Sequence, residues 1–284
     1  MEIKYTCTAW GCEKVDAAGL INKVAGAGYD GIEINMPIGG TFASEFISAY
    51  ESLLKSRPGF IFIAQQLTNP ENENVDTYIS KLEKRLLELA AYQPLFINSH
   101  TGKDYYSFDD NCRAIETALN VSSKTGIPIL HETHRGRFSF HAPTLLPYLK
   151  KFPEMELVGD FSHFCTVSES MLHDQQAILD QIIPHVSHLH ARVGFEQMPQ
   201  VSNPFAPEWK DHLDRFTGWW DQVLAHQKSA GKQEFTITPE FGPPPYMPVM
   251  PFTQVPLSDQ WEVNLQMREY LKELYILNKK AFRN

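Results

Sequence analysis

The chain has 284 residues, of which 43% are hydrophobic and 21% are charged, values typical of a soluble globular protein. Its formal net charge of −9 has the wrong sign for general electrostatic binding to nucleic acid. No apolar run approaches the ~20 residues that cross a bilayer, so no membrane association is expected.

The N-terminal segment and the cysteines favour a cytoplasmic protein. Met1–Thr8 is predicted to be a strand, not the charged and then apolar segment of a signal peptide. The four cysteines contain no CxxC pair, which favours reduced thiols: Cys7, Cys12, Cys112 and Cys165. An exported protein whose signal peptide has been removed is the alternative.

Apolar, β-rich segments alternate with amphipathic segments along the whole chain, as expected of repeated strand–helix units. The predicted strands are Ile3–Thr8, Gly31–Met36, Phe60–Gln66, Leu95–His100, Ile127–Glu132, Glu156–Asp160, Val186–Arg192 and Phe235–Glu240. The helices predicted to follow them are Asp16–Gly26, Ala43–Ser56, Val75–Tyr92, Phe108–Lys124, Pro143–Lys151, Asp174–Ile183, His212–Ser229 and Asp259–Lys279. Eight such pairs without a linker predict an α/β fold, a single-domain (β/α)8 TIM barrel over residues 1–284.

A doubly wound open sheet is the main alternative architecture. Such a sheet usually carries a glycine-rich phosphate turn after an early strand, and this chain has no GxGxxG or GxxxxGK[ST] motif. The fifth and sixth predicted strands are nearly continuous apolar runs that end in polar residues, as buried parallel strands do. Both observations favour the barrel.

Two connections are longer than usual for an α/β protein, at about residues 193–211 and 241–258. Both are expected to leave the C-terminal rim of the barrel. The second holds six prolines, with Tyr246 and Phe252 between them. Because proline restricts the backbone, we expect rigid walls or lids over an active site, with an oligomer contact or a functionless insertion as the alternative.

Four residues of metal-binding type lie at the ends of four successive predicted strands: Glu132, Asp160, His190 and Glu240. In a closed parallel barrel these ends meet at the rim that carries the active site. Carboxylate oxygens and a neutral imidazole suit a hard or borderline divalent cation, so we predict a site for one Mn, Zn, Mg or Co ion. Any one of these residues taken alone would more often be a helix cap or a satisfied polar group.

Further polar residues are expected at the same mouth. His163 lies just past the sixth strand and is a candidate to orient a substrate oxygen, with an ordinary loop histidine as the alternative. His188 shares a strand face with His190 and is expected to support it, while Arg192 lies one step further out on that face. Glu33 ends the second strand and suits a role behind the ligands.

Other candidates for contact with a substrate end the earlier strands or follow the fifth. Gln66, His100 and Trp10 are placed to line the mouth or form its floor. His134 and Arg135 belong to the compact basic cluster closest to the predicted site, and an arginine there would bind substrate hydroxyls or an anionic group. Solvated loop side chains are the alternative for this cluster.

The order Glu … Asp-x-x-His … His-x-His-x-Arg … Pro-Glu on strands five to eight resembles the xylose isomerase-like TIM-barrel superfamily. This group contains sugar isomerases and epimerases and also metal-dependent AP endonucleases. The segment AGAGYDGIE, residues 25–33, is similar to an early motif of the group. The resemblance covers nearly the whole chain in order and spacing, and it implies the barrel fold and a divalent metal.

In the ketose 3-epimerases of this group, one metal is held by Glu, Asp, His and Glu. The resemblance therefore implies that Glu132, Asp160, His190 and Glu240 are ligands. It also implies that the two glutamates form the acid–base pair, and that His163 and Arg192 contact the substrate. Two departures stand out: Arg192 follows the ligand histidine by only two residues, and the segment HETHRGR around Glu132 is unlike the epimerase pattern.

We therefore expect a metal-dependent sugar isomerase or epimerase of carbohydrate metabolism that works through a metal-stabilised enediolate. The alternatives are a metal-dependent dehydratase (a lyase) of a polyol-derived ketone and a non-catalytic sugar-binding barrel. A DNA-repair nuclease is disfavoured, because Gln65 or Gln66 stands where its third-strand histidine is expected. The expected partner is a small sugar-like molecule, and the pattern permits a homo-oligomer.

Overall fold

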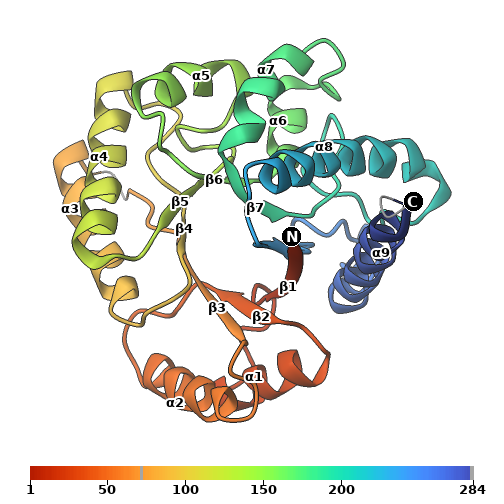
Figure 1. Ribbon diagram of the computed structural model, residues 1–284, viewed down its shortest axis with the longest axis horizontal. Coiled ribbons are helices and arrows are strands. Elements are labelled where there is room, and N and C mark those ends of the chain that lie inside the picture. Colours follow the sequence, from red (N-terminus) through yellow and green to blue (C-terminus); the bar gives the residue numbers. More distant parts are fainter. Residues whose placement is uncertain (71–72, 282–284) are drawn as a thin grey trace.

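The computed structural model describes residues 1–70 and 73–281. Within them, eight strands form a closed barrel in sequence order, and every neighbouring pair is parallel (Figure 1). The strands are β1 Glu2–Thr8, β2 Gly31–Ile34, β3 Ile61–Gln66, β4 Ile97–Ser99, β5 Ile129–Glu132, β6 Leu157–Gly159, β7 Val186–His190 and β8 Glu234–Thr238. The predicted (β/α)8 barrel is confirmed.

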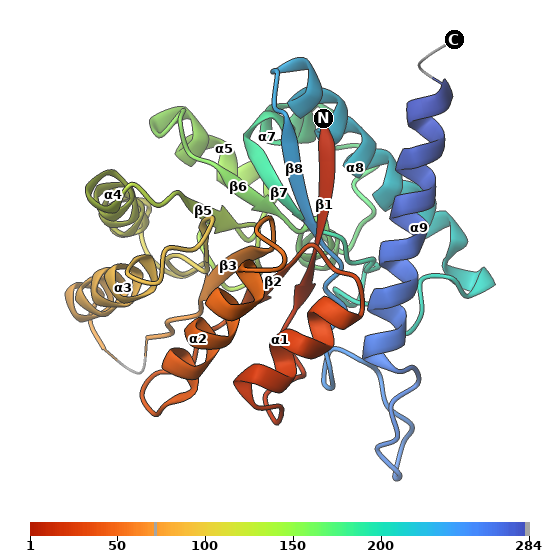
Figure 2. The same cartoon turned by 60° about the horizontal axis from the view of Figure 1, so that its bottom comes forward.

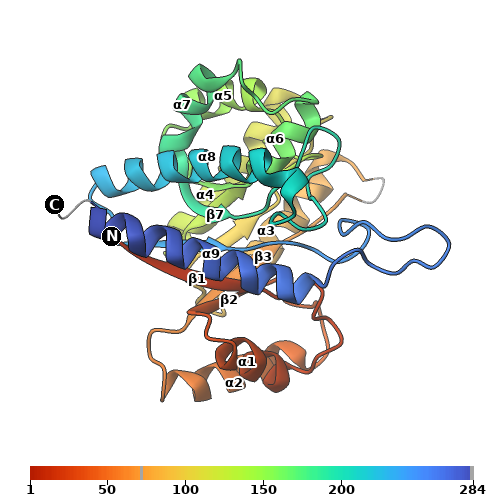
Figure 3. The same ribbon diagram turned by 90° about the vertical axis from the view of Figure 1, so that its right-hand side faces the viewer.

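The helices form a layer around the outside of the barrel (Figure 2). They are α1 Ala17–Gly26, α2 Phe42–Leu54, α3 Val75–Ala90, α4 Phe108–Thr125, α5 Ala142–Lys151, α6 Phe161–Ser168, α7 Gln176–Ile182, α8 Lys210–Ser229 and α9 Gln260–Ala281. The last two lie side by side (Figure 3), with the hydroxyls of Thr217 and Tyr270 3.4 Å apart. Within the described residues, no helix is long and apolar enough to cross a membrane.

The sequence predicted one helix after the sixth strand, and the structure has two. Helix α6 begins directly after Asp160, whose side chain accepts a hydrogen bond from the Ser162 backbone N–H at 3.0 Å and so caps the helix. Phe161, Phe164 and Cys165 of this helix are fully buried. The predicted helix Asp174–Ile183 corresponds to α7, which is shorter.

Five strands, β2, β4, β6, β7 and β8, end earlier than predicted. As a result, Asp160, Arg192 and Glu240 lie just beyond the last three of them. At the end of β8 the physical reason is Pro239, which has no N–H group to extend the pairing between strands. At the end of β6 the reason is Asp160, which starts a helix. These positions carry their side chains over the C-terminal mouth of the barrel.

The inside of the barrel consists of an apolar layer beneath a polar one. A separate buried cluster consists of Ile63 on β3, Phe96 directly before β4, Leu130 on β5 and Val158 on β6. Two residues further along the chain, on the same face, stand Gln65, Asn98, Glu132 and Asp160. On the β3–β6 side this apolar layer fills the barrel below the polar side chains, while the hydrogen-bonded pair His188 and Thr236 fills the same level on β7 and β8.

Gly31 lets β2 approach β3 closely. A Cβ atom at this position would lie 2.5 Å from both the Cβ and the carbonyl oxygen of Ile61. We expect Gly31→Ala to lower the free energy of unfolding by about 1–3 kcal/mol through overpacking, measured by urea denaturation. Gly59→Ala is the control, because no atom lies within 4 Å of its added Cβ; equal stability of the two variants would contradict this account of the packing.

The long connection between β8 and α9 runs out from the body as a narrow arm (Figure 3). An antiparallel bridge between Val249 and Pro256 holds its two sides together. Phe252 in this arm is fully exposed, whereas Tyr246 near its base lines the cavity at the barrel mouth. Within this connection, the expected wall over the site is therefore formed by the base of the arm.

Candidate metal centre

The four residues expected to hold a metal lie together. One side-chain donor atom from each of Glu132, Asp160, His190 and Glu240 lies within 4.8 Å of the others, and all four residues are buried. They converge because β5 to β8 are consecutive neighbours in the closed barrel and present their C-terminal ends to one mouth. Their role as metal ligands stays a prediction, and the buried His/Glu/Asp cluster is a candidate metal site.

The charges around this cluster fit a divalent cation. Four buried carboxylates meet here, those of Glu33, Glu132, Asp160 and Glu240, and Arg192 is the one arginine or lysine that the described residues place against them. Burial opposes protonation of His190, but Glu240, Glu33 and Glu132 raise its pKa well above the usual value, so without a metal a protonated His190 offsets part of the remaining negative charge. Burying unpaired charge is costly, so a divalent cation at this point would offset a large part of that cost.

His190 provides a second sign that the site is built for a cation. Its Nδ1 atom is buried and makes no well-aligned hydrogen bond, although it lies 2.9 Å from Glu240 Oε2 and 3.5 Å from Glu132 Oε1. In a neutral ring with its proton on Nε2, the Nδ1 lone pair would be repelled by the two carboxylates, so without a metal the ring favours a second proton, in line with the raised pKa of His190. The same lone pair would coordinate a metal ion held between those oxygens.

The pKa values reflect the same crowding of charge. Burial raises the pKa of Asp160 to about 6, even though the neighbouring Arg192 guanidinium acts in the opposite direction. Burial would also raise the pKa of Glu132, but the charges of His100 and His190 hold it well below its usual value. Glu132 is therefore an ionised acceptor, and an added cation would favour the ionised form of Asp160.

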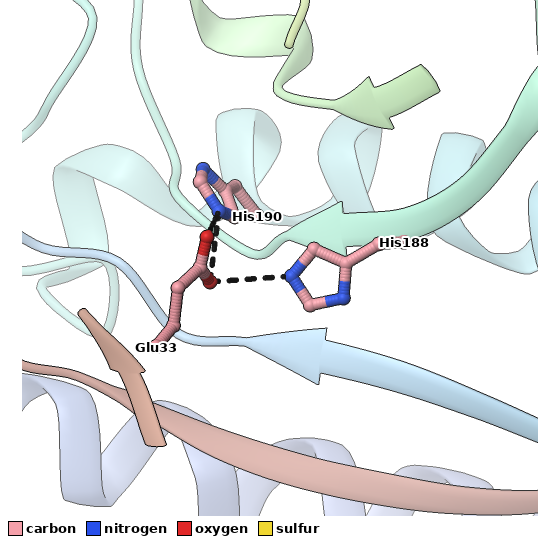
Figure 4. A group of neighbouring side chains, drawn as sticks. All are labelled: Glu33, His188 and His190. Atoms are coloured by element: carbon pink, nitrogen blue, oxygen red, sulfur yellow. Dashed lines mark hydrogen bonds and ion pairs between the residues drawn. The ribbon is translucent and has the colours of Figure 1, made fainter. Parts of the chain in front are cut away.

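Behind His190 lies Glu33, which faces the other ring nitrogen (Figure 4). Glu33 Oε1 lies 3.0 Å from His190 Nε2, and Glu33 Oε2 lies 3.4 Å from His188 Nε2. Thr238 donates a hydrogen bond to the same carboxylate at 2.7 Å. The contact between Glu33 and His190 favours a proton on His190 Nε2. It leaves Nδ1 free to bind a metal ion at the cluster, an arrangement common to metal-binding histidines.

Replacing Glu33 by glutamine should therefore weaken metal binding without removing a ligand. The Glu33 carboxylate favours the His190 tautomer with its proton on Nε2, and glutamine lacks the charge that does so. We therefore expect about tenfold weaker Mn²⁺ binding, measured by isothermal titration calorimetry. Glu13→Gln is the matched control, because Glu13 is exposed and lines the cavity outside the cluster. Equal Mn²⁺ affinities for the two variants would contradict this role for Glu33.

Asn98 and Gln65 belong to the site, and the sequence did not single them out as such. Asn98 Nδ2 donates to Glu33 Oε1 at 2.9 Å and to Glu132 Oε2 at 2.8 Å. Gln65 Nε2 donates to Glu33 Oε1 at 3.2 Å and to Glu240 Oε1 at 3.3 Å. The two amides thus hold three of the carboxylates in place. Each lies two residues beyond an inward apolar residue, but alternation alone could not find them, because apolar residues stand on both faces of these strands.

The prediction that Gln66 lines the mouth is wrong. Gln66 accepts a hydrogen bond from the Ser99 hydroxyl at 2.9 Å, and it is Gln65 that lines the cavity. The physical reason is the period of two in a strand, which directs adjacent side chains to opposite faces.

His100 and His134 stand where they were expected. His100 Nε2 lies 2.8 Å from Glu132 Oε2, and the two imidazole rings lie 4.4 Å apart. Both line the cavity, as does Trp10, whose ring packs edge-on against Tyr246 at 4.8 Å. Contact of these residues with a substrate stays a prediction.

Arg192 is more closely engaged with the cluster than the sequence indicated. Its guanidinium pairs with Asp160, donates to His163 Nε2 at 2.8 Å and lies 3.5 Å from Glu240 Oε2. His163 is fully buried, is absent from the described lining of the cavity and contacts Arg192. Contact of His163 with a substrate stays a prediction.

Arg135 is also turned toward another residue of the protein. Its guanidinium lies 4.9 Å from the ring centre of Tyr246, a cation–π contact, and it is absent from the described cavity lining. Arg135 therefore steadies the base of the arm in this structure. A direct contact with a substrate remains a prediction.

A cavity of about 420 Å³ opens beside the cluster. Among the residues predicted for the site, its lining includes Trp10, His100, Glu132, His134, Arg192 and Glu240. Its size is in the range of small-molecule sites. The candidate metal centre therefore borders a space large enough for a sugar-sized ligand.

No protein-family model matches the sequence, and no curated protein shows significant similarity to it. Solved structures do match the fold. A xylose isomerase-like TIM-barrel protein from Mycobacterium smegmatis in complex with magnesium has a TM-score of 0.60 at 14% identity, covering 94% of each chain. A sugar phosphate isomerase/epimerase from Parabacteroides distasonis has a TM-score of 0.56 at 12% identity, covering 94% of this chain and 97% of that one.

A third similar structure is a probable 3-DHS dehydratase involved in petrobactin synthesis from Bacillus anthracis. Its TM-score is 0.60 at 15% identity, covering 95% of this chain and 98% of that one. The likeness extends over nearly the full length of all three chains. The chain thus has the fold of the xylose isomerase-like TIM barrels, with a buried candidate metal site at the C-terminal mouth.

Proposed function

We propose that the protein is a divalent-metal-dependent isomerase or epimerase that moves a proton on the carbon beside a carbonyl in a sugar or a sugar-derived ketone. The observation that carries this proposal is the placement of Glu132 and Glu240. Their carboxylates come from β5 and from just beyond β8, both reach His190 Nδ1, and both line one cavity. Two carboxylates at one substrate space suit proton removal and proton return.

A divalent cation held by Glu132, Asp160, His190 and Glu240 would act as a Lewis acid and make the proton beside a carbonyl easier to remove. The chain itself supplies the groups that receive and return the proton. Asn98 and His100 fix Glu132 in one orientation, each at 2.8 Å from Oε2. Glu240 accepts a hydrogen bond from Gln65 at 3.3 Å, its other oxygen lies 2.9 Å from His190 Nδ1 and 3.5 Å from the Arg192 guanidinium, and its side chain lines the cavity.

The site can also be interpreted as a dehydratase. The likeness to the probable 3-DHS dehydratase supports this second candidate. A lyase would use the same proton removal and then expel a hydroxyl group, which needs an acid near the leaving oxygen. His100 lines the cavity beside Glu132 and is the candidate for that task. Burial lowers the pKa of the neighbouring His134 well below its usual value, so His134 is neutral and less suited to act as the acid.

The experiment that separates these functions is solvent deuterium exchange followed by NMR. The metal-loaded protein is incubated in deuterated water with a panel of ketoses and polyol-derived ketones. We expect deuterium on the carbon beside the carbonyl without loss of water. Products that have lost water would favour the dehydratase, and the absence of both reactions would favour a sugar-binding barrel without catalysis.

A further inference from the structure

The cavity beside the candidate metal centre is polar on one side and apolar on the other. The polar side comes from the ends of β3, β4, β5, β7 and β8 and carries Gln65, His100, Glu132, Arg192 and Glu240. The other side comes mainly from the segments that follow β1, β2 and β3. We call it the apolar wall, and it consists of Trp10, Leu20, Ile34, Phe42, Leu67 and Tyr246.

The apolar wall offers little to a polyhydroxylated chain. Outside the polar side, the hydrogen-bonding groups of the described lining are the side chains of Glu13, Asn35 and His134 and, on the apolar wall itself, the Tyr246 hydroxyl and the Trp10 indole N–H. A ketose tail with three hydroxyl groups would leave some of them without partners against aliphatic carbon. Losing hydrogen bonds to water without replacement opposes binding, whereas an apolar substituent gains from leaving water.

The cavity is also poorly equipped for a phosphate group. Arg192 is the one arginine or lysine in the described lining, and it is already paired with Asp160. Phosphate recognition usually needs arginine or lysine side chains that remain free, and Glu13 adds negative charge on this side. The N-terminus of α2, at Phe42, is the remaining feature that favours an anion, and a phosphorylated probe tests it.

Trp10 is held in place as part of the apolar wall. Gln260 Nε2 donates to the Trp10 carbonyl at 2.6 Å, and the ring packs edge-on against Tyr246. A Cβ atom at Gly242 would lie 2.2 Å from the Trp10 ring, so glycine is what allows the ring to stand there. The side chain of Gln200 holds the backbone of Gly242: its Oε1 accepts from the Gly242 N–H at 2.7 Å, and its Nε2 donates to the Gly242 carbonyl at 3.1 Å.

We propose that the substrate of this site is an unphosphorylated hydroxyketone with a compact apolar or aromatic substituent. Its polar head faces Glu132 and Glu240, and its substituent packs against the apolar wall. This inference rests on the proposed function for the orientation of the head. It goes further because it proposes that the apolar wall selects the substituent of the substrate. Long polyol chains and sugar phosphates are then expected to be poor substrates.

The test uses four hydroxymethyl ketones that share one head and differ in the tail: dihydroxyacetone, xylulose, dihydroxyacetone phosphate and benzyl hydroxymethyl ketone. Dissociation constants for the Mn²⁺-loaded full chain are measured by isothermal titration calorimetry. Deuterium exchange at the hydroxymethyl carbon is followed separately by NMR. We expect benzyl hydroxymethyl ketone to bind roughly tenfold more tightly than dihydroxyacetone, and neither the phosphate nor the polyol tail to improve binding.

A matched pair of variants locates the effect. Leu67→Gln places an amide in the apolar wall, whereas Leu95→Gln makes the same change at a leucine that is 51% exposed and absent from the described lining. We expect Leu67→Gln to remove most of the preference for the benzyl tail, measured as the ratio of the dissociation constants of dihydroxyacetone and benzyl hydroxymethyl ketone. Leu95→Gln should preserve this ratio. Circular dichroism confirms that each variant is folded, and if Leu67→Gln does not fold, the ligand series on the unaltered chain decides.

The outcomes separate this inference from the proposed function. Tighter binding of xylulose or of the phosphate than of the benzyl ketone, or binding of none of the four, overturns the inference. If xylulose binds best and exchanges deuterium, the proposed function stands without it. If the benzyl ketone binds best and no ketone exchanges deuterium or loses water, the inference about the ligand stands and the proposed catalysis fails.

Discussion

Glu240→Gln is expected to reduce deuterium exchange by roughly a hundredfold to ten-thousandfold, the contribution typical of a positioned acid–base group. Glutamine keeps the shape of the side chain and its contact with Gln65 but cannot accept a proton. It also weakens one predicted contact with the cation. Glu132→Gln should have an effect of similar size, because that carboxylate faces the same cavity. The rate of solvent exchange on the substrate identified from the panel is the measurement.

Glu13→Gln is the control for both changes, since Glu13 is an exposed carboxylate of the same cavity. Each variant is also titrated with Mn²⁺, so that a lost proton acceptor can be told apart from a lost metal. A Glu240→Gln protein that retains metal and has lost exchange would support the acid–base assignment. Full activity in both the Glu240→Gln and Glu132→Gln proteins would contradict it.

Removing divalent metal is the second change with a large expected effect. Dialysis against a chelator should abolish exchange and lower the melting temperature by several degrees, because the buried carboxylates lose the charge that offsets their repulsion. Adding Mn²⁺ back should restore both. For a ligand at one hundred times its dissociation constant, binding stabilises the folded state by about 2.7 kcal/mol. Differential scanning fluorimetry and NMR follow the two effects in parallel.

Asp160→Asn provides the control for the metal experiment. The amide preserves an oxygen to cap α6 but removes a charge from the cluster, so the fold should persist while Mn²⁺ stabilises it less. If Mn²⁺ raised the melting temperature of this variant and of the unaltered chain by the same amount, the ion would be binding elsewhere. If the chelated protein kept full activity, the proposed mechanism would be wrong.

The barrel and the meeting of the four predicted ligands could be inferred from the sequence because both depend on the alternation of strands and helices. Once the eight strands are placed, residues at their ends must approach one another at the mouth. Glu132 and His190 lie within their strands, and Asp160 and Glu240 lie just past theirs. The observed strand ends lie one or two residues before some of the predicted ones, but the four predicted ligands still meet at the mouth.

Other features depended on contacts that the sequence does not display. Gln66 was chosen over Gln65 because the inward face of β3 could not be fixed from a strand with apolar residues on both faces. The bond from Asn98 to Glu132 depends on the register between β4 and β5. Helix α6 was missed because its start relies on one side-chain cap within a short apolar segment.

The apolar wall was also beyond sequence reasoning. Leu20, Ile34 and Leu67 look like ordinary core residues in the sequence, and only the structure places them beside a cavity. Tyr246 lies in a proline-rich segment whose direction cannot be derived from composition. Specificity in such a barrel depends on the loops around a constant centre, so it is the least predictable part of the site.

The central claim is that one divalent cation binds between the ends of β5 to β8, and anomalous X-ray scattering from crystals of the Mn²⁺-loaded protein tests it most directly. The account predicts one strong peak per chain, about 2.0–2.2 Å from donor atoms of Glu132, Asp160, His190 and Glu240. A peak elsewhere, or no peak at this position under saturating Mn²⁺, would contradict it.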